Sequence, residues 1–327
     1  MYALWVMFSW NTHSKPLIAL APMADMTDSS FCRVVKSLST TPIIFREMVS
    51  SEAIVRENEK TWKMTKIHSQ ERPVIQQIFG GDPMVMARAA TLIEENNHPE
   101  GIDINMGCPV HKLTQNFNGA ALMKEPEKAS KIVKAIKQVI SLPVSVKIRT
   151  GWSQETECLE FVRVLEEAGA DLITIHGRTK TQGYSGKANW DIIRQAKKNV
   201  SLPIIANGDI TSAELALQAL QETECDGITI ARGALGNPWI FLQIDELLSG
   251  KPLTPVTLEQ RVHLVQKHVR LQIENQGEHG IITFRKHLTW YFKGIPGAKQ
   301  FRERLHTITS LTNLDDLLKE MLNTLAN

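Results

Sequence analysis

The chain has 327 residues, of which 43% are hydrophobic and 22% are charged, and its formal net charge is +2. This balance is ordinary for a soluble globular protein that can bury a large core. Its four cysteines lie far apart and form no C-x-x-C pair, so the sequence indicates neither a disulfide framework nor a zinc site. We therefore expect one large domain and one smaller domain, a reducing cytoplasm as the location, and no metal.

The amino-terminal residues, Met1 to Trp10, are apolar but have no basic residue ahead of them. About ten residues cannot cross a bilayer core of ~30 Å as a helix, so we expect no membrane span. The residues from Lys15 onward show no small-residue cleavage pattern, which disfavours a secretory signal without removing that alternative. Residues 1–14 are interpreted as an extension that packs on the protein or is disordered.

Eight short β-branched runs recur along the chain with helical patterns between them. Their near-continuous apolar character is typical of parallel strands that helices cover on the outside. Eight such units are what a closed (β/α)₈ TIM barrel requires, and we predict that barrel over residues 15–247. The predicted strands are Leu17 to Pro22, Pro42 to Phe45, Pro73 to Phe79, Gly101 to Asn105, Pro143 to Arg149, Asp171 to His176, Pro203 to Asn207 and Asp226 to Ala231.

The intervening segments carry helix signals. The segment from Asp82 to Ile93 begins with an acidic cap and a proline in its first turn. Apolar residues recur at helical spacing from Glu155 to Ala168 and from Ser212 to Leu220. Each of these helices returns the chain to its next strand.

The alternation ends after Leu247, where a Gly/Pro-rich stretch runs from Ser249 to Pro255. Everything beyond it has a helical pattern, so we predict a second, helical domain over residues 254–327. Between Arg261 and His306 there are nine Lys or Arg and three Glu, a local balance of +6 in a chain whose total is +2. The positive charge is therefore concentrated in the helical domain.

Polar residues gather at the predicted strand ends, where TIM barrels carry their chemistry. The loops after strands seven and eight often hold a phosphate on backbone N–H groups, and glycines allow its close approach. Arg232 would add a charge-assisted contact, which favours a phosphorylated cofactor. The polar groups at or near strand ends are Asp25, Arg46, Glu47, Gln76, Gln77, Asn105, Cys108, Lys147, Arg149, His176, Arg178, Asn207, Asp209 and Arg232.

Two of these residues have both a structural and a functional interpretation. Lys147 lies within the fifth strand, where it is either an edge lysine paired with a carboxylate or a cation beside an electron-accepting ring or a phosphate. His176 ends the sixth strand, where it is either a satisfied core group or a cofactor contact. No other His, Cys or carboxylate lies at metal-ligand spacing from it, so we favour hydrogen bonding to a cofactor over metal binding.

Cys108 is the first candidate for chemistry. It lies between Gly107 and Pro109 in a turn just beyond the fourth strand, where its thiol would face a cleft. A thiol there can be a nucleophile, a metal ligand or a proton donor, and the surrounding motifs favour the donor. The alternative, a small buried hydrophobe, suits Cys158 and Cys225 better.

With these residues assembled, the chain resembles a tRNA-dihydrouridine synthase, and most closely the bacterial B-type members. The likeness spans about two-thirds of the chain and adds two motifs of the helical domain, Phe284 to Tyr291 and Gly294 to Gly297. The matching barrel motifs are Leu20-Ala-Pro-Met-Ala24 with Thr27-Asp28, Gln77-Ile-Phe-Gly80, Asn105-Met-Gly-Cys-Pro109, Gly119-Ala-Ala-Leu-Met123, Val146 to Trp152, Ile175-His-Gly-Arg-Thr179, Ala206-Asn-Gly-Asp-Ile210 and Gly233 to Phe241.

The resemblance implies an FMN enzyme that uses NADPH, or NADH, to reduce the C5–C6 double bond of uridines in tRNA. It implies that Cys108 protonates C5 as a general acid, with Asn105, Arg149 and Arg178 orienting the uracil. The residues that would hold FMN are Pro22, Met23, Ala24, Gln77, Lys147, His176, Asn207, Gly208, Asp209, Ala231 and Arg232.

The expected partner is tRNA at its D-loop or elbow, bound by a monomer, with position 17 as the favoured uridine by likeness to the B type. The basic helical domain would supply the grip, because RNA contacts combine phosphate-binding cations with aromatic surfaces. The candidate residues are Arg285, Lys286, Trp290, Tyr291, Phe292, Lys293, Lys299, Arg302 and Arg304.

The chain departs from the family pattern at three positions. Asp25 and Ala231 each replace a usual glycine, and Cys32 replaces a common arginine. Ala231 still offers a backbone N–H to a phosphate if its φ is negative. Two alternatives stay open: a flavin barrel that acts on a free pyrimidine, and a tRNA-binding protein without catalysis.

Overall fold

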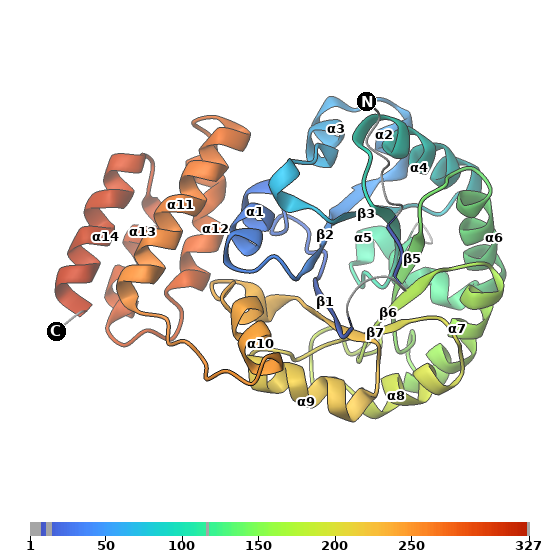
Figure 1. Cartoon of the computed structure of the whole chain (residues 1–327). Coiled ribbons are helices and arrows are strands. Elements are labelled where there is room, and N and C mark those ends of the chain that lie inside the picture. Colours follow the sequence, from blue (N-terminus) through green and yellow to red (C-terminus); the bar gives the residue numbers. More distant parts are fainter. Residues whose placement is uncertain (1–7, 11–14, 116–117, 326–327) are drawn as a thin grey trace, which may run out of the picture.

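The protein is built on a closed barrel of eight parallel strands, shown by a computed structural model that describes residues 8–10, 15–115 and 118–325 (Figure 1). Neighbouring strands pair in chain order and β8 returns to β1. The TIM barrel predicted from the eight apolar runs is therefore confirmed. The strands are β1 (Leu17–Leu20), β2 (Ile43–Ser50), β3 (Val74–Phe79), β4 (Gly101–Met106), β5 (Val144–Arg149), β6 (Leu172–His176), β7 (Ile204–Asn207) and β8 (Gly227–Ile230).

Helices surround the barrel and then continue beyond it to the carboxyl terminus (Figure 1). Those of the barrel are α1 (Ser29–Leu38), α2 (Ser51–Val55), α3 (Glu59–Thr65), α4 (Pro83–Asn97), α5 (His111–Thr114), α6 (Pro126–Lys137), α7 (Cys158–Glu167), α8 (Trp190–Lys198), α9 (Ala213–Thr223) and α10 (Ile240–Leu248). Those beyond it are α11 (Leu258–Gln276), α12 (Gly280–Tyr291), α13 (Arg302–Thr307) and α14 (Leu311–Leu325).

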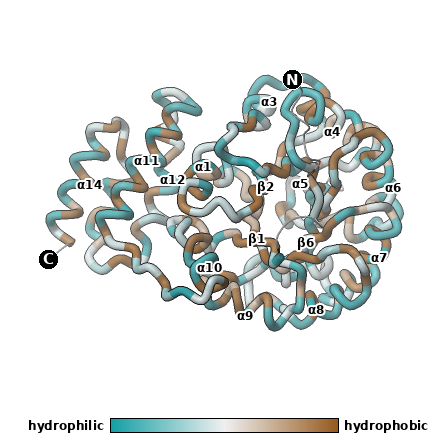
Figure 2. The backbone as a smooth tube through the Cα atoms, in the orientation of Figure 1, coloured by the Kyte–Doolittle hydropathy of each residue, from teal (hydrophilic) through white to brown (hydrophobic). Residues whose placement is uncertain are grey.

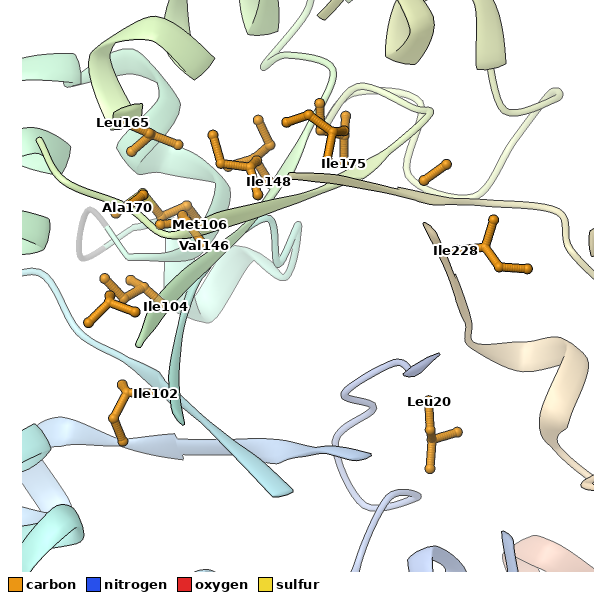
Figure 3. Packing of buried hydrophobic residues seen from close by; sticks show 14 of the residues in the cluster. Leu20, Ile102, Ile104, Met106, Val146, Ile148, Leu165, Ala170, Ile175 and Ile228 are labelled. Carbon is orange, nitrogen blue, oxygen red and sulfur yellow. The ribbon is translucent and has the colours of Figure 1, made fainter. Parts of the chain in front are cut away.

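Alternate residues of each strand face the outer helices and form the main core. Figure 3 shows Ile104 and Met106 of β4 beside Val146 of β5, with Leu165 of α7 packed outside them. The barrel helices are hydrophilic along much of their outer surface (Figure 2). Burial of the outward strand positions therefore accounts for the apolar residue at every second position of each run.

The remaining alternate residues point into the barrel, and at its amino-terminal end they are apolar. Trp10 lies there with an exposed fraction of 3% and stacks on Phe45, with their ring centroids 6.1 Å apart. This part of the predicted extension packs on the protein, whereas residues 1–7 and 11–14 lie outside the described residues. The cluster at this end consists of Trp10, Leu17, Ala19, Ile43, Phe45, Ile75, Leu172 and Ile205.

The helix signals predicted from the sequence appear as real caps. Asp82 accepts hydrogen bonds from the N–H groups of Met84 and Val85 at the start of α4. Ser212 caps α9 in the same way, by accepting from Leu215. The second strand is the main difference, because it continues to Ser50 through a register shift after Arg46. Arg46 and Glu47 therefore lie inside β2 and not beyond its end.

Helices α11 to α14 form a second apolar cluster that meets the barrel at α1 (Figure 1). Phe31 of α1 packs against His268 of α11 and His287 of α12, with ring centroids 5.6 and 5.4 Å apart. Both histidines are fully buried. No helix in the described part of the chain is long and apolar enough to cross a membrane.

Candidate active site at the carboxyl end of the barrel

A cavity of about 860 Å³ opens at the carboxyl end of the strands and extends to the helices beyond the barrel. Its size falls in the range of ~300–1,000 Å³ that is usual for ligand sites. Nearly every residue that the sequence marked as functional lines it. Those residues are Pro22, Met23, Ala24, Gln77, Asn105, Cys108, Lys147, Arg149, His176, Asn207, Gly208, Asp209, Ala231 and Arg232.

The backbone around Cys108 is fixed on three sides. Asn105 Oδ1 accepts hydrogen bonds from the N–H groups of Gly107, at 3.1 Å, and Cys108, at 2.9 Å. Arg149 Nε donates to the Gly107 carbonyl at 2.8 Å, and Ala120 N–H donates to the Cys108 carbonyl at 3.0 Å. The Cys108 side chain faces the cavity and is partly exposed. A partly exposed thiol on a rigid turn is well placed to deliver a proton to a bound molecule.

Gly119 explains part of the motif that follows this turn. Its φ is +58°, and a Cβ there would lie 2.9 Å from the Cys108 carbonyl oxygen. Only glycine accepts this backbone without strain and without displacing the turn. The Gly119 segment thus packs directly against the Cys108 turn from outside.

The centre of the cavity is strongly cationic. Lys147 is buried, and its pKa is lowered to about 8 by that burial and by the neighbouring Arg149. Burial, followed by the charges of Lys147, Arg149, Arg178 and Arg232, holds the pKa of His176 well below its usual range. His176 is therefore neutral at pH 7 and can donate one hydrogen bond and accept another. Such a concentration of positive charge is suited to an anionic ligand.

Arg178 is the one predicted site residue that does not line the cavity. It is buried, and its Nη2 reaches both carboxylate oxygens of Asp209 at 2.8 Å. It also donates to the carbonyls of Ser185 and Gly186. Its guanidinium group therefore holds the loop after β6 against the loop after β7.

Arg149 lines the cavity, but its guanidinium group is also engaged. Besides the Gly107 carbonyl it bonds to the carbonyls of Thr179 and Gly183, each at 2.8 Å. The residue is only 2% exposed. Arg149 thus connects the Cys108 turn to the loop after β6, and its charge acts on the cavity from the wall.

The loops after β7 and β8 bring backbone close to the cavity. Gly208 has a φ of +124°, and a Cβ there would lie 2.7 Å from Ala188 Cβ. A Cβ on Gly233 would lie 2.2 Å from the Ile210 carbonyl oxygen. Asn207 Nδ2 donates to the Thr229 carbonyl at 2.8 Å, which joins the two strands. Two glycine turns beside Arg232 form the type of cradle that holds a phosphate.

Four residues of the cavity wall were not predicted to lie at the active site: the sequence analysis gave no role to Tyr184 or Arg261, and it assigned Trp290 and Lys293 to the tRNA contact. Tyr184 is 60% exposed, and the guanidinium groups of Arg232 and Arg149 lie 4.7 and 5.7 Å from its ring centroid. An aromatic residue in the glycine-rich loop after the sixth strand was an available signal for it. The other three, Arg261, Trp290 and Lys293, come from α11, α12 and the turn after α12.

Comparison with known proteins places the chain in a family. The model of the dihydrouridine synthase (Dus) family matches residues 19–327. The chain belongs to the dihydrouridine synthase family. It is 36% identical to a probable tRNA-dihydrouridine synthase 1 of Synechocystis sp., over 97% of this chain and 88% of that protein. It is 38% identical to tRNA-dihydrouridine synthase B of Pasteurella multocida, over 90% of this chain and 89% of that protein.

Solved structures with little sequence similarity share the barrel fold. A 2-naphthoyl-CoA reductase complex superposes with a TM-score of 0.56 at 12% identity and covers 72% of this chain and 50% of that chain. Histamine dehydrogenase from Rhizobium sp. 4-9 has the same TM-score and identity and covers 95% of this chain and 63% of that chain. This chain spans half to two-thirds of those proteins, and the likeness shows the fold alone.

The departures from the dihydrouridine synthase pattern have structural explanations. Asp25 has a φ of +62°, which explains why glycine is usual there, and its N–H donates to Glu47 Oε2 at 2.8 Å. Ala231 has a φ of −102°, so the condition for an N–H directed to a phosphate is met. Cys32 is fully buried in α1, where its thiol lies 3.6 Å from the Thr27 carbonyl.

The aromatic residues assigned to RNA contact are mostly core residues. Tyr291 is fully buried and its hydroxyl lies 3.0 Å from His268 Nδ1, and Phe292 is 5% exposed. Trp290 alone of the three lines the cavity, with Lys293 Nζ 5.0 Å from its ring centroid. The helical pattern of these residues on α12 thus serves packing first.

Two of the six assigned cations are engaged within the protein. Arg304 pairs with Glu320, and Arg285 donates to the Ile308 carbonyl at 2.6 Å. No carboxylate of the described residues lies within ion-pair distance of the other four. These are Lys286, Lys293, Lys299 and Arg302.

Proposed function

We propose that this protein, a tRNA-dihydrouridine synthase by its family, reduces a D-loop uridine with FMN as its cofactor and NADPH or NADH as reductant. The single observation that carries the proposal is the Cys108 turn at the edge of a cationic cavity with a phosphate cradle at its far side. A proton donor and an anion site in one cavity are what flavin-dependent reduction of a base requires.

The cavity fits FMN at its phosphate end. Gly208 and Gly233 both line the cavity, and neither has a side chain between its backbone and a bound phosphate. Arg232 would pair with the phosphate, and Asn207 and Ala231 would complete its cradle. Asp209, held by Arg178, would brace the loop and not contact the phosphate directly.

The ring end of FMN would lie between the loop after β1 and the inward residues of β3, β5 and β6. Pro22, Met23 and Ala24 would cover one side of it, and Gln77 would offer hydrogen bonds. Lys147 and His176 supply positive charge and a neutral hydrogen-bonding ring. When bound, FMN supplies the hydride, which it takes from the nicotinamide and delivers to C6 of the uracil.

The protein's own residues would complete the reaction at C5. Hydride addition at C6 leaves negative charge on C5 and O4, and Cys108 would transfer its thiol proton to C5, leaving a thiolate that solvent reprotonates. Asn105 would orient the uracil, because its amide is fixed beside Cys108. Lys147 and Arg149 would stabilise the charge on O4.

The helical part would hold the tRNA. We propose that residues 15–247 form the catalytic domain and residues 254–327 the tRNA-binding domain of a monomer, with Lys293 and Trp290 where the two meet. Lys286, Lys299 and Arg302 would contact phosphates, whereas Arg304 is engaged with Glu320. Likeness to the B-type enzymes favours position 17 as the target.

The experiment records the visible absorption spectrum of the purified protein through one cycle of reduction and reoxidation. The purified protein should show a flavin spectrum that bleaches on anaerobic addition of NADPH and recovers on addition of tRNA lacking dihydrouridine. Recovery with free uridine in place of tRNA would instead support a barrel that acts on a free pyrimidine. A colourless protein that cannot be reconstituted with FMN would overturn the cofactor assignment.

A further inference from the structure

We propose that Asp103, a buried carboxylate outside the cavity, is a positioning residue that sets the orientation of the Asn105 amide and thereby holds the Cys108 turn. The inference rests on the proposed role of Cys108 as proton donor. It concerns a residue that touches neither cofactor nor substrate and acts through Gln77.

A continuous chain of hydrogen bonds connects Asp103 to Cys108. The register of the barrel places Asp103 of β4 beside Gln77 of β3 and Ser145 of β5. Ser145 Oγ donates to Asp103 Oδ1 at 2.6 Å, and Gln77 Nε2 donates to Asp103 Oδ2 at 2.6 Å. Asn105 Nδ2 donates to Gln77 Oε1 at 2.8 Å, while Asn105 Oδ1 accepts from Cys108 N–H at 2.9 Å.

The Asp103 carboxylate at one end and the N–H groups of Gly107 and Cys108 at the other fix the direction of the bonds in this series. An ionised carboxylate only accepts hydrogen bonds, so Gln77 must turn its NH₂ group to Asp103 and its oxygen to Asn105. Asn105 must then turn its NH₂ group to Gln77 and its oxygen to the two N–H groups of the turn. If Asn105 were reversed, its NH₂ group would face those N–H groups, and three donors would lie together without an acceptor. Ser145 cannot set this direction, because a hydroxyl both donates and accepts.

The surroundings of Asp103 keep this acceptor in place. Asp103 is fully buried, and burial raises its pKa to about 6, while the bonds from Ser145 and Gln77 and the charge of Lys147 act in the opposite direction. These three residues, from β3 and β5, are the polar and charged groups that act on it. Asp103 is therefore an anion at pH 8, and the variants of this hydrogen-bond network are best compared at that pH.

The test separates the two half-reactions. Asp103→Ala should slow reoxidation of the reduced enzyme by unmodified tRNA by about tenfold or more, because the buried Gln77 amide is left without its acceptor. Reduction by NADPH and the Kd for tRNA should stay within about threefold, and the alkylation rate of Cys108 should change. Asp103→Asn should restore reoxidation, because its amide oxygen can accept from Gln77 while its NH₂ group donates to Ser145.

Ser145→Ala is the matched control, since it removes the bond to the other carboxylate oxygen and leaves Gln77 engaged. It should reoxidise at nearly the wild-type rate. The proposal is overturned if Asp103→Ala reoxidises normally, or if Asp103→Asn is as slow as Asp103→Ala. The wild-type redox cycle tests the proposed function separately, so the two failures are distinguishable.

Gln77→Glu keeps the proposal testable if Asp103→Ala does not fold. The introduced carboxyl group and Asp103 would share one proton, which preserves the direction of the chain until that proton dissociates. We expect the tRNA-driven reoxidation of this variant to fall with rising pH where the wild-type rate does not. A pH profile parallel to that of the wild type would contradict the role of Asp103.

A second observation, independent of the first, concerns a basic surface on the barrel rim. Lys124 Nζ and Lys180 Nζ lie 5.0 and 4.4 Å from the ring centroid of Trp152. The three residues follow β4, β5 and β6 respectively, at the end of the barrel where the cavity opens. We call Lys124, Trp152 and Lys180 the rim patch.

We infer that the rim patch binds the phosphate backbone of the tRNA on the side of the cavity opposite the helical part. In a closed ring of eight strands β5 lies across from β1, and α1, which follows β1, carries α11. Two ammonium groups on one indole repel each other unless an anion lies nearby. Among the described residues neither lysine has an ion-pair partner, so both charges are available to RNA.

The experiment measures the salt dependence of tRNA binding. Lys124→Ala with Lys180→Ala should lower the slope of log Kd against log salt by about two, since each lysine neutralises one phosphate. Lys131→Ala with Lys134→Ala, on the exposed face of α6, is the matched control and should leave the slope unchanged. Equal slopes in the two double variants, or an effect on the KM for NADPH alone, would overturn the inference.

Discussion

The two ends of the barrel are built on the same eight strands and have opposite chemistry. At the amino-terminal end the inward residues are apolar, and Trp10 covers them. At the carboxyl end the inward residues include Gln77, Asn105, Lys147 and His176. Period-two alternation thus gives each strand an apolar outer face and an inner face that changes from packing to chemistry along its length.

The difference shows where this protein is stabilised and where it is not. Burial lowers the pKa of Lys147 and of His176, which means that the folded state opposes their charged forms. The cluster at the amino-terminal end consists of apolar residues, so folding there buries no ionisable side chain of that cluster. We therefore expect substitutions at the carboxyl end to change rates with small effects on stability, and substitutions at the other end to do the reverse.

The largest effect should come from Cys108→Ala. Loss of the proton donor should slow tRNA-driven reoxidation by about 10²–10⁴-fold, while reduction by NADPH stays close to wild type. The free energy of unfolding should change little, because the side chain is partly exposed. Cys158→Ala, a buried cysteine on α7, is the control and should keep the wild-type rate. An unchanged rate for Cys108→Ala would remove it as the donor.

Trp10→Ala, at the amino-terminal end of the barrel, should lower the stability of the protein and leave its reaction rate unchanged. Truncation of a buried tryptophan typically costs about 3–5 kcal/mol of unfolding free energy, measured by denaturant titration. The rate of reoxidation at 20 °C should remain that of the wild type, since Trp10 lies at the end away from the cavity. Met84→Ala, which truncates an exposed methionine on α4, should leave both quantities unchanged. A loss of activity without a loss of stability would contradict the comparison.

The barrel and most of the site could be predicted from the sequence because both depend on local order. Apolar runs reveal strands, and alternation within a strand places Lys147 and His176 at its inner face. The Cys108 turn can be recognised in the sequence because Gly107 and Pro109 flank the cysteine. These signals need no knowledge of distant contacts.

The remaining features depend on contacts between distant segments. Arg178 lies two residues after β6 and Arg149 is the last residue of β5, yet only Arg178 is held away from the cavity, by its ion pair with Asp209. Arg261, Trp290 and Lys293 reach the site only because the helical part docks on the barrel. No local pattern distinguishes Trp290, which lines the cavity, from the buried Tyr291 beside it.

Acid should weaken the docking of the helical part on α1 of the barrel. Burial lowers the pKa of His287 to about 4 and that of His268 well below its usual range. The rings of His268, Phe31 and Phe284 pack around His287, with centroids 4.6, 5.4 and 5.9 Å away. The charge of Asp28 raises the pKa of His287 and that of Lys286 lowers it. The fold therefore prefers the neutral rings.

Stability should then be complete above the unfolded histidine pKa of ~6.5 and fall as the pH drops from there toward 4, by about 3 kcal/mol for His287. Denaturant titrations between pH 7 and 4.5 check this. His287→Phe should flatten the decline, whereas His263→Gln, an exposed residue of α11, should not. Equal declines in all three proteins would place the acid sensitivity elsewhere.

The smallest effect that still distinguishes the two ends is expected at Tyr184. Its ring is exposed at the cavity mouth between Arg149 and Arg232, where a base or nucleotide could stack on it. Because base–aromatic stacking is worth about 1–3 kcal/mol, Tyr184→Ala should raise the Kd for tRNA by about 5- to 150-fold. Tyr184→Phe should bind nearly as the wild type, since it keeps the ring. Both variants should unfold like the wild type, because an exposed side chain contributes little to stability. If Tyr184→Ala instead destabilised the fold and left tRNA binding intact, the loop after β6 would serve stability and not substrate binding.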